Sequence, residues 1–124
     1  MRKNNYMMIE REVEKADKLW DTLNSILYDS FYVDEVKKAL PGFCLLANMR
    51  LGIWTHPQYD ETVYFKSTDG HYGKWNFSFS RLNLHLLSYA FNKDGCIIVD
   101  STRKGKQFPD SLSKTIPIWI CVMN

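Results

Sequence analysis

The sequence predicts a single domain of the α/β or α+β class, in which N-terminal helices pack on a mixed sheet. Three observations lead to this prediction. A stretch with helical periodicity opens the chain, and short apolar runs with strand character follow from Phe43 onward. The 124 residues suffice for one core but are too few for two domains of ordinary size. We therefore expect residues 1–124 to form one domain.

The first forty residues have the periodicity of helices. Apolar residues recur at steps of three and four between Ile9 and Ser30, as they do along the buried face of an amphipathic helix. Asp34 can begin a second, short helix, which Pro41 and Gly42 would end because neither residue continues a helix readily. We expect two helices here, with a scaffolding role.

Strands are expected after these helices. Residues 43–47, 53–54 and 62–65 are short apolar pieces separated by Gly, Pro, Asn and Asp. The run Cys96–Val99 has the composition of a buried strand, and Asp100 ends it. These pieces predict the sheet.

Two more helices and one aromatic stretch complete the prediction. Residues 82–91 could form a helix in which His85 is packed or hydrogen-bonded, and Thr115 could cap a terminal helix that has Pro117 in its first turn. Aromatic residues alternate with polar ones over residues 75–80, which is typical of a half-buried strand; stacking on nucleic-acid bases is the alternative.

Composition indicates a globular protein outside the membrane. Apolar residues make up 45% and charged residues 24%, and no apolar run approaches the roughly 20 residues that span a bilayer. The N-terminus becomes acidic where a signal peptide stays apolar, so we expect a cytoplasmic protein. Cys44, Cys96 and Cys121 form no metal-binding spacing and sit among apolar neighbours, so we expect reduced core residues.

Charge is distributed unevenly along the chain. Residues 1–65 contain eight basic and ten acidic side chains, whereas residues 66–124 contain eight basic and only four acidic ones. A basic second half favours a polyanionic partner, although a solvated surface can show the same bias.

The first polar cluster follows the predicted strand 62–65. It consists of Lys66, Ser67, Thr68, Asp69, Gly70 and His71. Hydroxyls, a glycine N–H and an ammonium can surround a phosphate, and Asp69 and His71 add one proton acceptor and one titratable group. The alternative is an ordinary turn before a hairpin, because the same residue types dominate turns.

The second polar cluster follows the strand Cys96–Val99. It consists of Asp100, Ser101, Thr102, Arg103, Lys104, Gly105 and Lys106. A carboxylate at the end of a buried strand, followed by hydroxyls and cations, suits a phosphorylated ligand with its metal ion. A solvated basic turn explains the composition equally well.

A third cluster, residues 110–115, precedes the terminal helix and is first of all a capping segment, although Lys114 could meet an anion there. The phosphate-loop, dinucleotide and HExxH zinc motifs are all missing from the sequence. No cysteine is followed by a glycine-containing, Arg-ended phosphatase loop. The common nucleotide-binding and hydrolase classes are therefore excluded.

Two long stretches carry a family resemblance. VYFKSTDGHYGKWNFSFSRLNLHLL and CIIVDSTRKGKQFPDSLSKTIPIW are similar to the initiator tRNA phosphoribosyl transferases, and LNSILYDSFYV and LLANMRLGIW resemble the N-terminal part of that family. The family transfers ribose phosphate from phosphoribosyl pyrophosphate to a 2′-hydroxyl of initiator tRNA. The resemblance therefore implies a glycosyltransferase with these two substrates, and Mg²⁺ as a possible companion of the donor.

The resemblance also implies roles for the clusters. Asp69, His71 and Asp100 become candidates for acid/base or metal-facing residues. The candidates for substrate binding are Lys66, Ser67, Thr68, Gly70, Ser101, Thr102, Arg103, Lys104, Lys106 and Lys114. The alternative is a tRNA- or phosphate-binding module without catalysis, in which the carboxylates are turn residues. The observation that distinguishes the transferase from the binding module is whether the Lys66 and Asp100 loops meet at one cleft.

The family continues past the segment that ends here at Asn124, into a domain similar to dual-specificity phosphatases. The resemblance thus covers the family's N-terminal part only. We expect little or no transfer of ribose phosphate by this chain alone.

Overall fold

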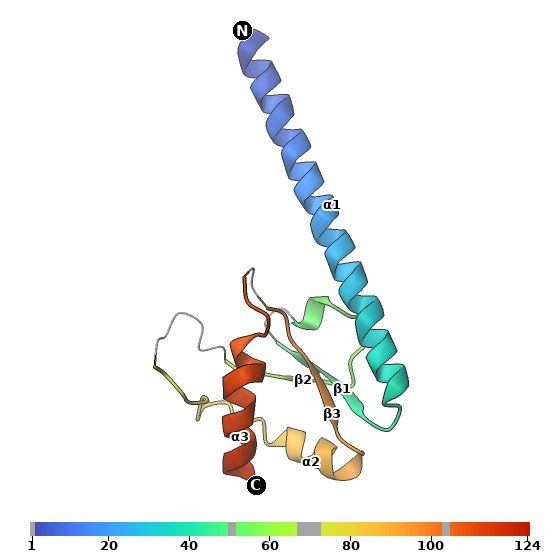
Figure 1. Ribbon diagram of the computed structural model, residues 1–124, viewed down its shortest axis with the longest axis vertical. Helices are drawn as coiled ribbons and strands as arrows, with labels where there is room; N and C mark the ends of the chain where they lie inside the picture. The colour runs from blue at the N-terminus through green and yellow to red at the C-terminus, as the bar shows by residue number, and fades with distance from the viewer. Residues whose placement is uncertain (1, 50–51, 67–72, 103–104) are drawn as a thin grey trace.

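The computed structural model describes residues 2–49, 52–66, 73–102 and 105–124. It is a small α/β domain with a parallel sheet, one long helix that projects from it and two short helices (Figure 1). The elements are α1 (Arg2–Ala39), β1 (Cys44–Asn48), β2 (Glu61–Val63), α2 (His85–Asn92), β3 (Cys96–Val99) and α3 (Ile116–Met123). The predicted fold class is confirmed.

The sheet has the order β2-β1-β3, so β1 lies in the middle. Both neighbours run parallel to it, with Leu46 beside Glu61 on one side and beside Ile98 on the other. All strand pairs among the described residues are thus parallel. The sequence predicted a mixed sheet, and that part of the prediction is wrong. The central position explains why all five residues of β1 are buried and why its sequence is a continuous apolar run that ends in a polar residue.

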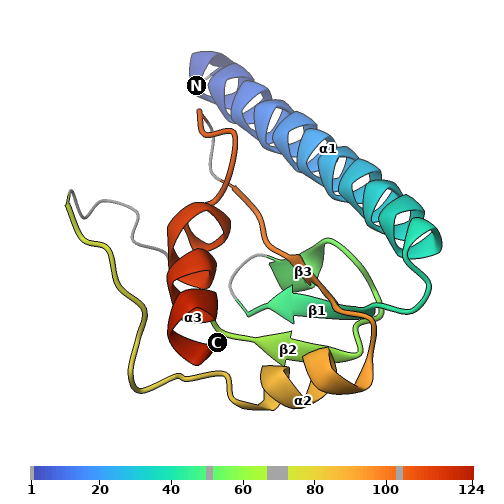
Figure 2. The ribbon, with the colours of Figure 1, turned by 60° about the horizontal axis from the view of Figure 1, so that its bottom comes forward.

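The core lies between the sheet and the two short helices. Figure 2 shows α1 on one side of the sheet and α2 with α3 on the other. Phe65 meets Trp119 edge to face, with 5.6 Å between ring centroids. The buried core residues are Cys44, Leu46, Val63, Phe65, Phe77, Leu86, Ile116 and Trp119.

Helix α1 is continuous, whereas the sequence predicted two helices separated before Asp34. The carboxylate of Asp34 does not cap a helix; it accepts a hydrogen bond from Nε2 of His56 at 2.9 Å. No proline or glycine interrupts residues 2–39, so nothing forces a break. Only the C-terminal third of α1 meets the sheet, where Val33 is buried. Residues 5–23 are exposed on every side and do not cover the sheet, contrary to expectation.

Among the described residues between β2 and α2 none forms a strand, and side-chain hydrogen bonds hold this part of the chain. Residues 74–78 are extended but unpaired; Phe77 is buried, while Trp75 and Phe79 are exposed, so the predicted half-buried strand is wrong. Asn83 pairs with both backbone polar groups of Tyr64: its Oδ1 accepts from the N–H at 2.9 Å and its Nδ2 donates to the carbonyl at 3.1 Å. The indole of Trp119 donates to the Leu82 carbonyl. These contacts fix α2, which begins at His85 rather than at residue 82.

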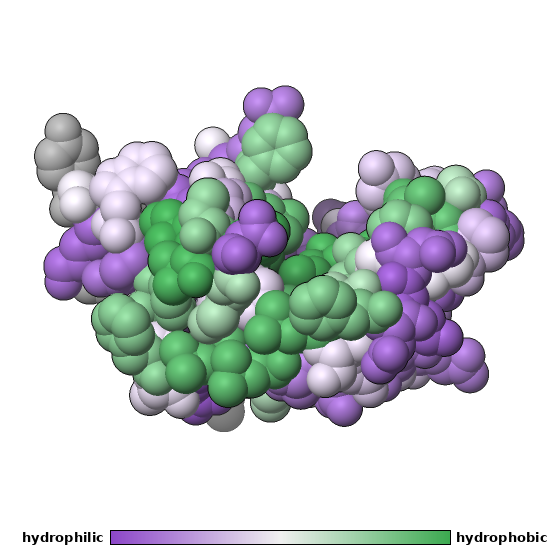
Figure 3. Space-filling model, turned by 90° about the horizontal axis from the view of Figure 1, so that it is seen from below, coloured by the Kyte–Doolittle hydropathy of each residue, from purple (hydrophilic) through white to green (hydrophobic). Residues whose placement is uncertain are grey.

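Apolar side chains also reach the surface. Figure 3 shows them gathered on the lower face of the molecule, and the exposed ones on α2 and α3 include Phe91, Ile120 and Val122. Cys44 is buried and Cys96 half-buried, but Cys121 is exposed on α3, so the prediction of three core cysteines is wrong for that residue. Within the described residues, no helix is both long enough and apolar enough to span a membrane.

Candidate functional site

The candidate site lies at the edge of the sheet where all three parallel strands end. Because the strands are parallel, the residues that follow β2 and β3 emerge at the same edge, beside the last residue of β1. The loop that begins at Lys66 follows β2, and the loop that begins at Asp100 follows β3. The two predicted clusters therefore start side by side, as a shared cleft requires.

Asn48 joins the two loops. Its Nδ2 donates to Oδ2 of Asp100 at 2.8 Å and to the carbonyl of Phe65 at 3.1 Å, and its Oδ1 accepts from the N–H of Phe65 at 2.9 Å. The side chain is fully buried. A buried amide that satisfies three groups at once fixes their relative positions, because moving any of them would leave a buried polar group without a partner.

Two hydroxyls from the segment before α3 complete the junction. Ser111 Oγ donates a short hydrogen bond to Oδ2 of Asp100, and Thr115 Oγ1 donates to the carbonyl of Lys66 at 2.9 Å. Both side chains are completely buried in the π turn Ser111–Thr115. Thr115 makes no side-chain cap to α3, so the predicted capping role is wrong; its hydroxyl holds the Lys66 loop instead.

The carboxylate of Asp100 is therefore fixed by three donors. Besides Asn48 and Ser111 on Oδ2, the N–H of Ser101 donates to Oδ1 at 2.8 Å. Thr102 is exposed, and its hydroxyl donates to the carbonyl of Lys106 at 3.4 Å. The side chain of Lys66 is exposed at the same edge. These hydrogen bonds thus hold one negative charge, the carboxylate of Asp100, in a fixed position near the exposed residues Thr102 and Lys66.

Two of the three described cations of the candidate set, Lys106 and Lys114, are held by one buried carboxylate. Lys106 Nζ lies 2.8 Å and Lys114 Nζ 3.9 Å from Oδ1 of Asp110, whose residue is 5% exposed. Lys114 Nζ also lies 5.2 Å from the centroid of the exposed Trp75 ring. Both lysines thus have protein partners close to the loop that carries the other predicted cations. Their positive charge is partly neutralised before any ligand arrives.

Seven residues of the predicted site lie outside the described part of the chain. They are Ser67, Thr68, Asp69, Gly70, His71, Arg103 and Lys104. His85, which the sequence assigned to a structural role, donates from Nε2 to the carbonyl of Thr62 at 2.9 Å.

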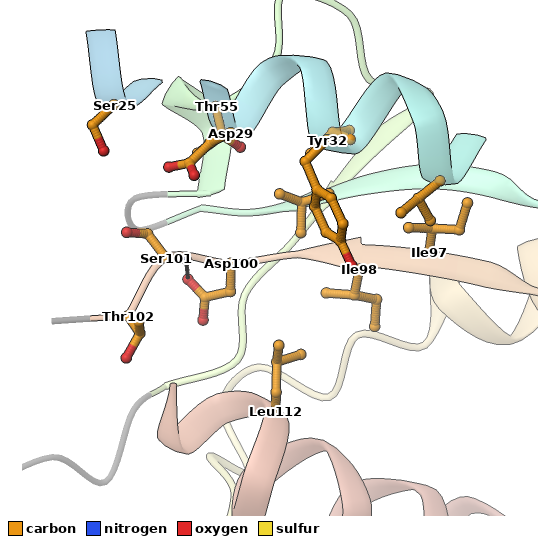
Figure 4. Close-up of a pocket in the computed structure, with 13 residues that line it drawn as sticks. Ser25, Asp29, Tyr32, Thr55, Ile97, Ile98, Asp100, Ser101, Thr102 and Leu112 are labelled. Carbon is orange, nitrogen blue, oxygen red and sulfur yellow. Dashed lines mark hydrogen bonds between the residues drawn. The ribbon is translucent and has the colours of Figure 1, made fainter. Parts of the chain in front are cut away.

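A pocket of about 570 Å³ opens next to Asp100, between α1 and β3 (Figure 4). Its apolar floor includes Ile98 and Leu112. Its polar groups come from α1, from Thr55, which follows the 3-10 turn Gly52–Trp54, and from the Asp100 loop. The polar lining residues are Ser25, Asp29, Tyr32, Thr55, Asp100, Ser101 and Thr102. Figure 4 shows Asp29 close to Thr55, with Asp100 and Ser101 across the opening.

Sequence reasoning missed Asn48, and it assigned Ser111 and Thr115 only to a capping segment. One signal was available for Asn48: it is a polar residue that ends a buried apolar strand, as Asp100 does. No comparable signal exists for the two hydroxyls, because their partners are 11 and 49 residues away in sequence. Among the described residues, no group of three or more His, Cys, Asp or Glu side chains could hold a metal ion by itself.

Comparison with known proteins places the chain in a family. A sequence profile described as the Rit1 N-terminal domain matches residues 13–124. The tRNA A64-2′-O-ribosylphosphate transferase of Saccharomyces cerevisiae is 47% identical over 120 residues, which are 94% of this chain and 23% of that protein. An uncharacterized protein of Schizosaccharomyces pombe is 54% identical over 104 residues, 82% of this chain and 23% of that protein.

The chain thus spans about a quarter of the length of these relatives, and no solved structure matches it. The profile covers nearly the whole chain and the two alignments cover most of it at high identity. The chain therefore belongs to the Rit1 N-terminal domain family.

Proposed function

We propose that this domain is the donor-handling part of a tRNA-modifying transferase, which moves ribose phosphate from phosphoribosyl pyrophosphate to a 2′-hydroxyl of initiator tRNA. The observation that carries the proposal is the convergence of the Lys66 and Asp100 loops on Asn48 at one sheet edge. The name of the yeast relative, a tRNA ribosylphosphate transferase, supports the reaction class.

The proposed reaction is a glycosyl transfer. The acceptor 2′-oxygen forms a bond to the anomeric carbon of the donor, the bond from that carbon to the pyrophosphate oxygen breaks, and the 2′-hydroxyl proton passes to a base. The step therefore needs cations around the departing pyrophosphate and one acceptor near the hydroxyl. Lys66 lies at this edge and the Asp100 loop begins there, and the cations in both loop sequences are of the right type.

The proposal gives different roles to the three candidate carboxylate and imidazole groups. Both oxygens of Asp100 already accept hydrogen bonds, so its charge is fixed in place and suits holding a ribose hydroxyl or a cation. In this proposal Asp69 and His71 are the candidates for the base.

Asp100 would also be the protein group nearest to Mg²⁺. Mg²⁺ is commonly held by one or two carboxylates together with substrate phosphates and water, so a single carboxylate at this edge fits an ion carried by the donor. When bound, the ion would neutralise charge on the leaving pyrophosphate.

The lining of the pocket beside Asp100 suits a sugar-containing ligand. Carboxylate and hydroxyl groups of its lining, such as Asp29 and Ser25, can hydrogen-bond ribose hydroxyls, while Ile98 and Leu112 offer an apolar wall. A phosphorylated ribose that extends from this pocket toward the Lys66 and Asp100 loops would use both features.

Binding of the donor tests the proposal, because the chain is a quarter of the length of its relatives and turnover is a less direct readout. We expect calorimetry to show saturable binding of phosphoribosyl pyrophosphate that Mg²⁺ strengthens. Asp100→Asn should weaken binding at least about tenfold, which corresponds to roughly 1.4 kcal/mol. Asp94→Asn, just before β3 at the opposite end of the sheet, is the matched control and should bind as the parent does.

One outcome would replace the proposal with its alternative. If the domain binds tRNA in a salt-dependent way but does not bind the donor with or without Mg²⁺, it is a tRNA-binding module. The carboxylate of Asp100 would then serve only to hold the sheet edge together.

A further inference from the structure

The projecting part of α1 carries a regular apolar seam that the proposed site does not use. Counting Tyr6 as position a of a heptad, the a and d positions between residues 6 and 27 are occupied by apolar or aromatic side chains. These residues are Tyr6, Ile9, Val13, Ala16, Trp20, Leu23 and Leu27. The spacing alternates strictly between three and four residues over three heptads, which is the pattern of a coiled coil.

The seam is open to solvent. Its large side chains are all at least 51% exposed, and Trp20 is 67% exposed. The face of α1 that meets the sheet is a different one, on which Val33 is buried and Ser25, Asp29 and Val36 line the pocket. Figure 1 shows the N-terminal half of α1 extending away from the rest of the domain. In proteins most of the stability of a helix comes from packing of its apolar face, so a partner on this seam would stabilise the projecting part of α1.

The sizes of the seam residues point to a second copy of the same chain. In an antiparallel pair of helices, an a residue of one helix lies beside a d residue of the other. A two-fold axis next to Lys18 would place the small Ala16 against Trp20 of the partner subunit. The remaining layers are then Val13 with Leu23, Ile9 with Leu27, and Tyr6 with Ser30, which occupies the next d position. Large residues thus face small ones and medium residues face each other, as close packing requires.

Charges next to the seam favour the antiparallel orientation. The flanking e and g positions carry Glu10, Glu12 and Asp17 and no cation. A parallel pair would place Glu12 against Asp17 of the partner subunit on both sides of the interface, which is repulsive. In the antiparallel pair Glu12 lies near the partner's Ile26 and Glu10 near the partner's Asn24, so only the two Asp17 side chains approach each other.

From this self-complementarity we propose that the domain forms an antiparallel homodimer through residues 6–30 of α1. The interface is isologous, with the same seam contributed by both copies. The pocket beside Asp100 is lined by Ser25 and Asp29, which lie within the same stretch of α1 but outside the a and d positions of the seam. The two copies would therefore meet on a different face of α1 from the one that lines the pocket.

The mass of the domain in solution tests the proposal. Sedimentation equilibrium over a roughly hundredfold concentration range should show a mass that rises from 14.6 kDa toward twice that value, because the dimer population follows mass action. Leu23→Glu places a charge in the seam of both copies and should weaken self-association at least about tenfold. Tyr28→Glu makes a comparable change on the same helix but outside the seam, and it should associate as the parent does.

A size swap tests the orientation. Ala16→Trp alone should disrupt the dimer, because two Trp side chains would then share one layer. The double variant Ala16→Trp, Trp20→Ala restores one large and one small residue in that layer and should regain at least about tenfold in association. Circular dichroism of each variant verifies that α1 remains helical.

Three results would overturn the proposal. The first is a monomer over the whole concentration range, which would assign the seam to a different occupant, such as a helix with basic flanking residues. The second is equal weakening by Leu23→Glu and Tyr28→Glu. The third is a folded size-swap variant that associates no better than Ala16→Trp, which would exclude the antiparallel register.

Discussion

Asn48 and Asp100 leave neighbouring strands at the same level and are joined side chain to side chain, with Asn48 Nδ2 2.8 Å from Asp100 Oδ2. The pair links the central strand to the loop that carries most of the predicted cations. Asn48 also binds both polar groups of the Phe65 backbone, one residue before Lys66. One buried amide thus sets the distance between the two halves of the candidate site.

Replacing Asn48 by Ala should destabilise the domain strongly. The change leaves the Phe65 N–H and carbonyl and one oxygen of Asp100 without their buried partner, and each such group costs about 1–3 kcal/mol. We expect the free energy of unfolding in urea to fall by about 3 kcal/mol or more. Asn76→Ala, at an exposed position, is the control and should change it by less than about 0.5 kcal/mol. Similar losses for the two variants would contradict the bridging role of Asn48.

Gly52 should not tolerate a side chain. A Cβ atom at this position would lie 2.1 Å from the carbonyl oxygen of Val99 and 3.1 Å from the Cα of Asp100, and backbone atoms cannot rotate away. Gly52→Ala must therefore displace the end of β3, and we expect a loss of roughly 2–4 kcal/mol in urea unfolding together with weaker donor binding.

Gly73→Ala is the control for Gly52→Ala, because it introduces backbone strain without steric overlap. Gly73 has a φ of 71°, but no atom of the described residues lies within 4 Å of its added Cβ, so the substitution should cost only about 1 kcal/mol. If Gly52→Ala proves as mild as Gly73→Ala, the close approach to Val99 is not a feature of the folded protein.

The three cysteines should differ sharply in reactivity. Burial, together with the hydrogen bond and the charge of the neighbouring Cys44 thiol at 3.0 Å, raises the pKa of Cys96 to about 12. Cys44 is itself almost completely buried, whereas Cys121 is exposed. Because the thiolate is the reactive form, iodoacetamide at pH 8 should modify Cys121 first in the native protein and all three residues after unfolding. Mass spectrometry of peptides from a timed reaction gives the order directly, and early modification of Cys96 would contradict it.

The raised pKa of Cys96 also has a consequence for stability. Between the ordinary thiol pKa of 9.0 and about 12, the folded state retains a proton that the unfolded state has lost. The folded state therefore binds more protons in this window, so stability should fall as the pH rises through it. Cys96→Ala should lose stability less steeply between pH 9 and pH 11 than the parent does. Equal slopes for the two proteins would show that Cys96 does not titrate differently on folding.

The sequence predicted the ends of an element correctly where a single residue, such as a glycine or an aspartate, terminates that element. Cys96–Val99 forms the strand that was predicted, because a four-residue apolar run with three β-branched residues, bounded by Gly95 and Asp100, has few alternatives. It also predicted that both polar clusters begin where strands end. Parallel pairing then brings Lys66 and Asp100, the first residues of those clusters, to the same edge of the sheet.

Predictions failed where a distant partner decides the conformation. Asp34 resembles a helix cap until His56 is found to bind it, and Thr115 resembles a cap until the Lys66 carbonyl is found beside it. The aromatic alternation at residues 75–79 predicts a strand, but Asn83 occupies the backbone groups of Tyr64 at the end of β2. The bonds that decide each case join residues 19 to 49 positions apart, beyond the reach of local patterns.

Lys106 should matter for stability, in contrast to an isolated surface cation. Its ammonium lies 2.8 Å from Asp110, whose side chain is only 7% exposed, so removing it weakens the neutralisation of a buried charge. Lys106→Ala should lower the free energy of unfolding by about 1–3 kcal/mol. The matched control is Lys15→Ala, which removes an ion pair with Glu12 in which both side chains are 70% exposed, and it should cost less than about 1 kcal/mol. Equal effects would contradict a structural role for the Lys106 pair.

The remaining cations of the Asp100 loop should act on the ligand. Because Lys106 contributes to folding, a triple variant of Arg103, Lys104 and Lys106 would mix stability with binding, and the double variant Arg103→Ala, Lys104→Ala is the sharper test. If these residues contact donor phosphate, calorimetry should show donor binding weakened at least about tenfold with little change in melting temperature. If they contact tRNA instead, affinity for tRNA should fall and its dependence on salt should become shallower. Arg11→Ala, Lys15→Ala on the projecting half of α1 removes the same charge and should leave both affinities unchanged. A folded Arg103→Ala, Lys104→Ala variant that binds both ligands like the parent would make this loop a solvated turn and leave Lys66 as the cation at the sheet edge.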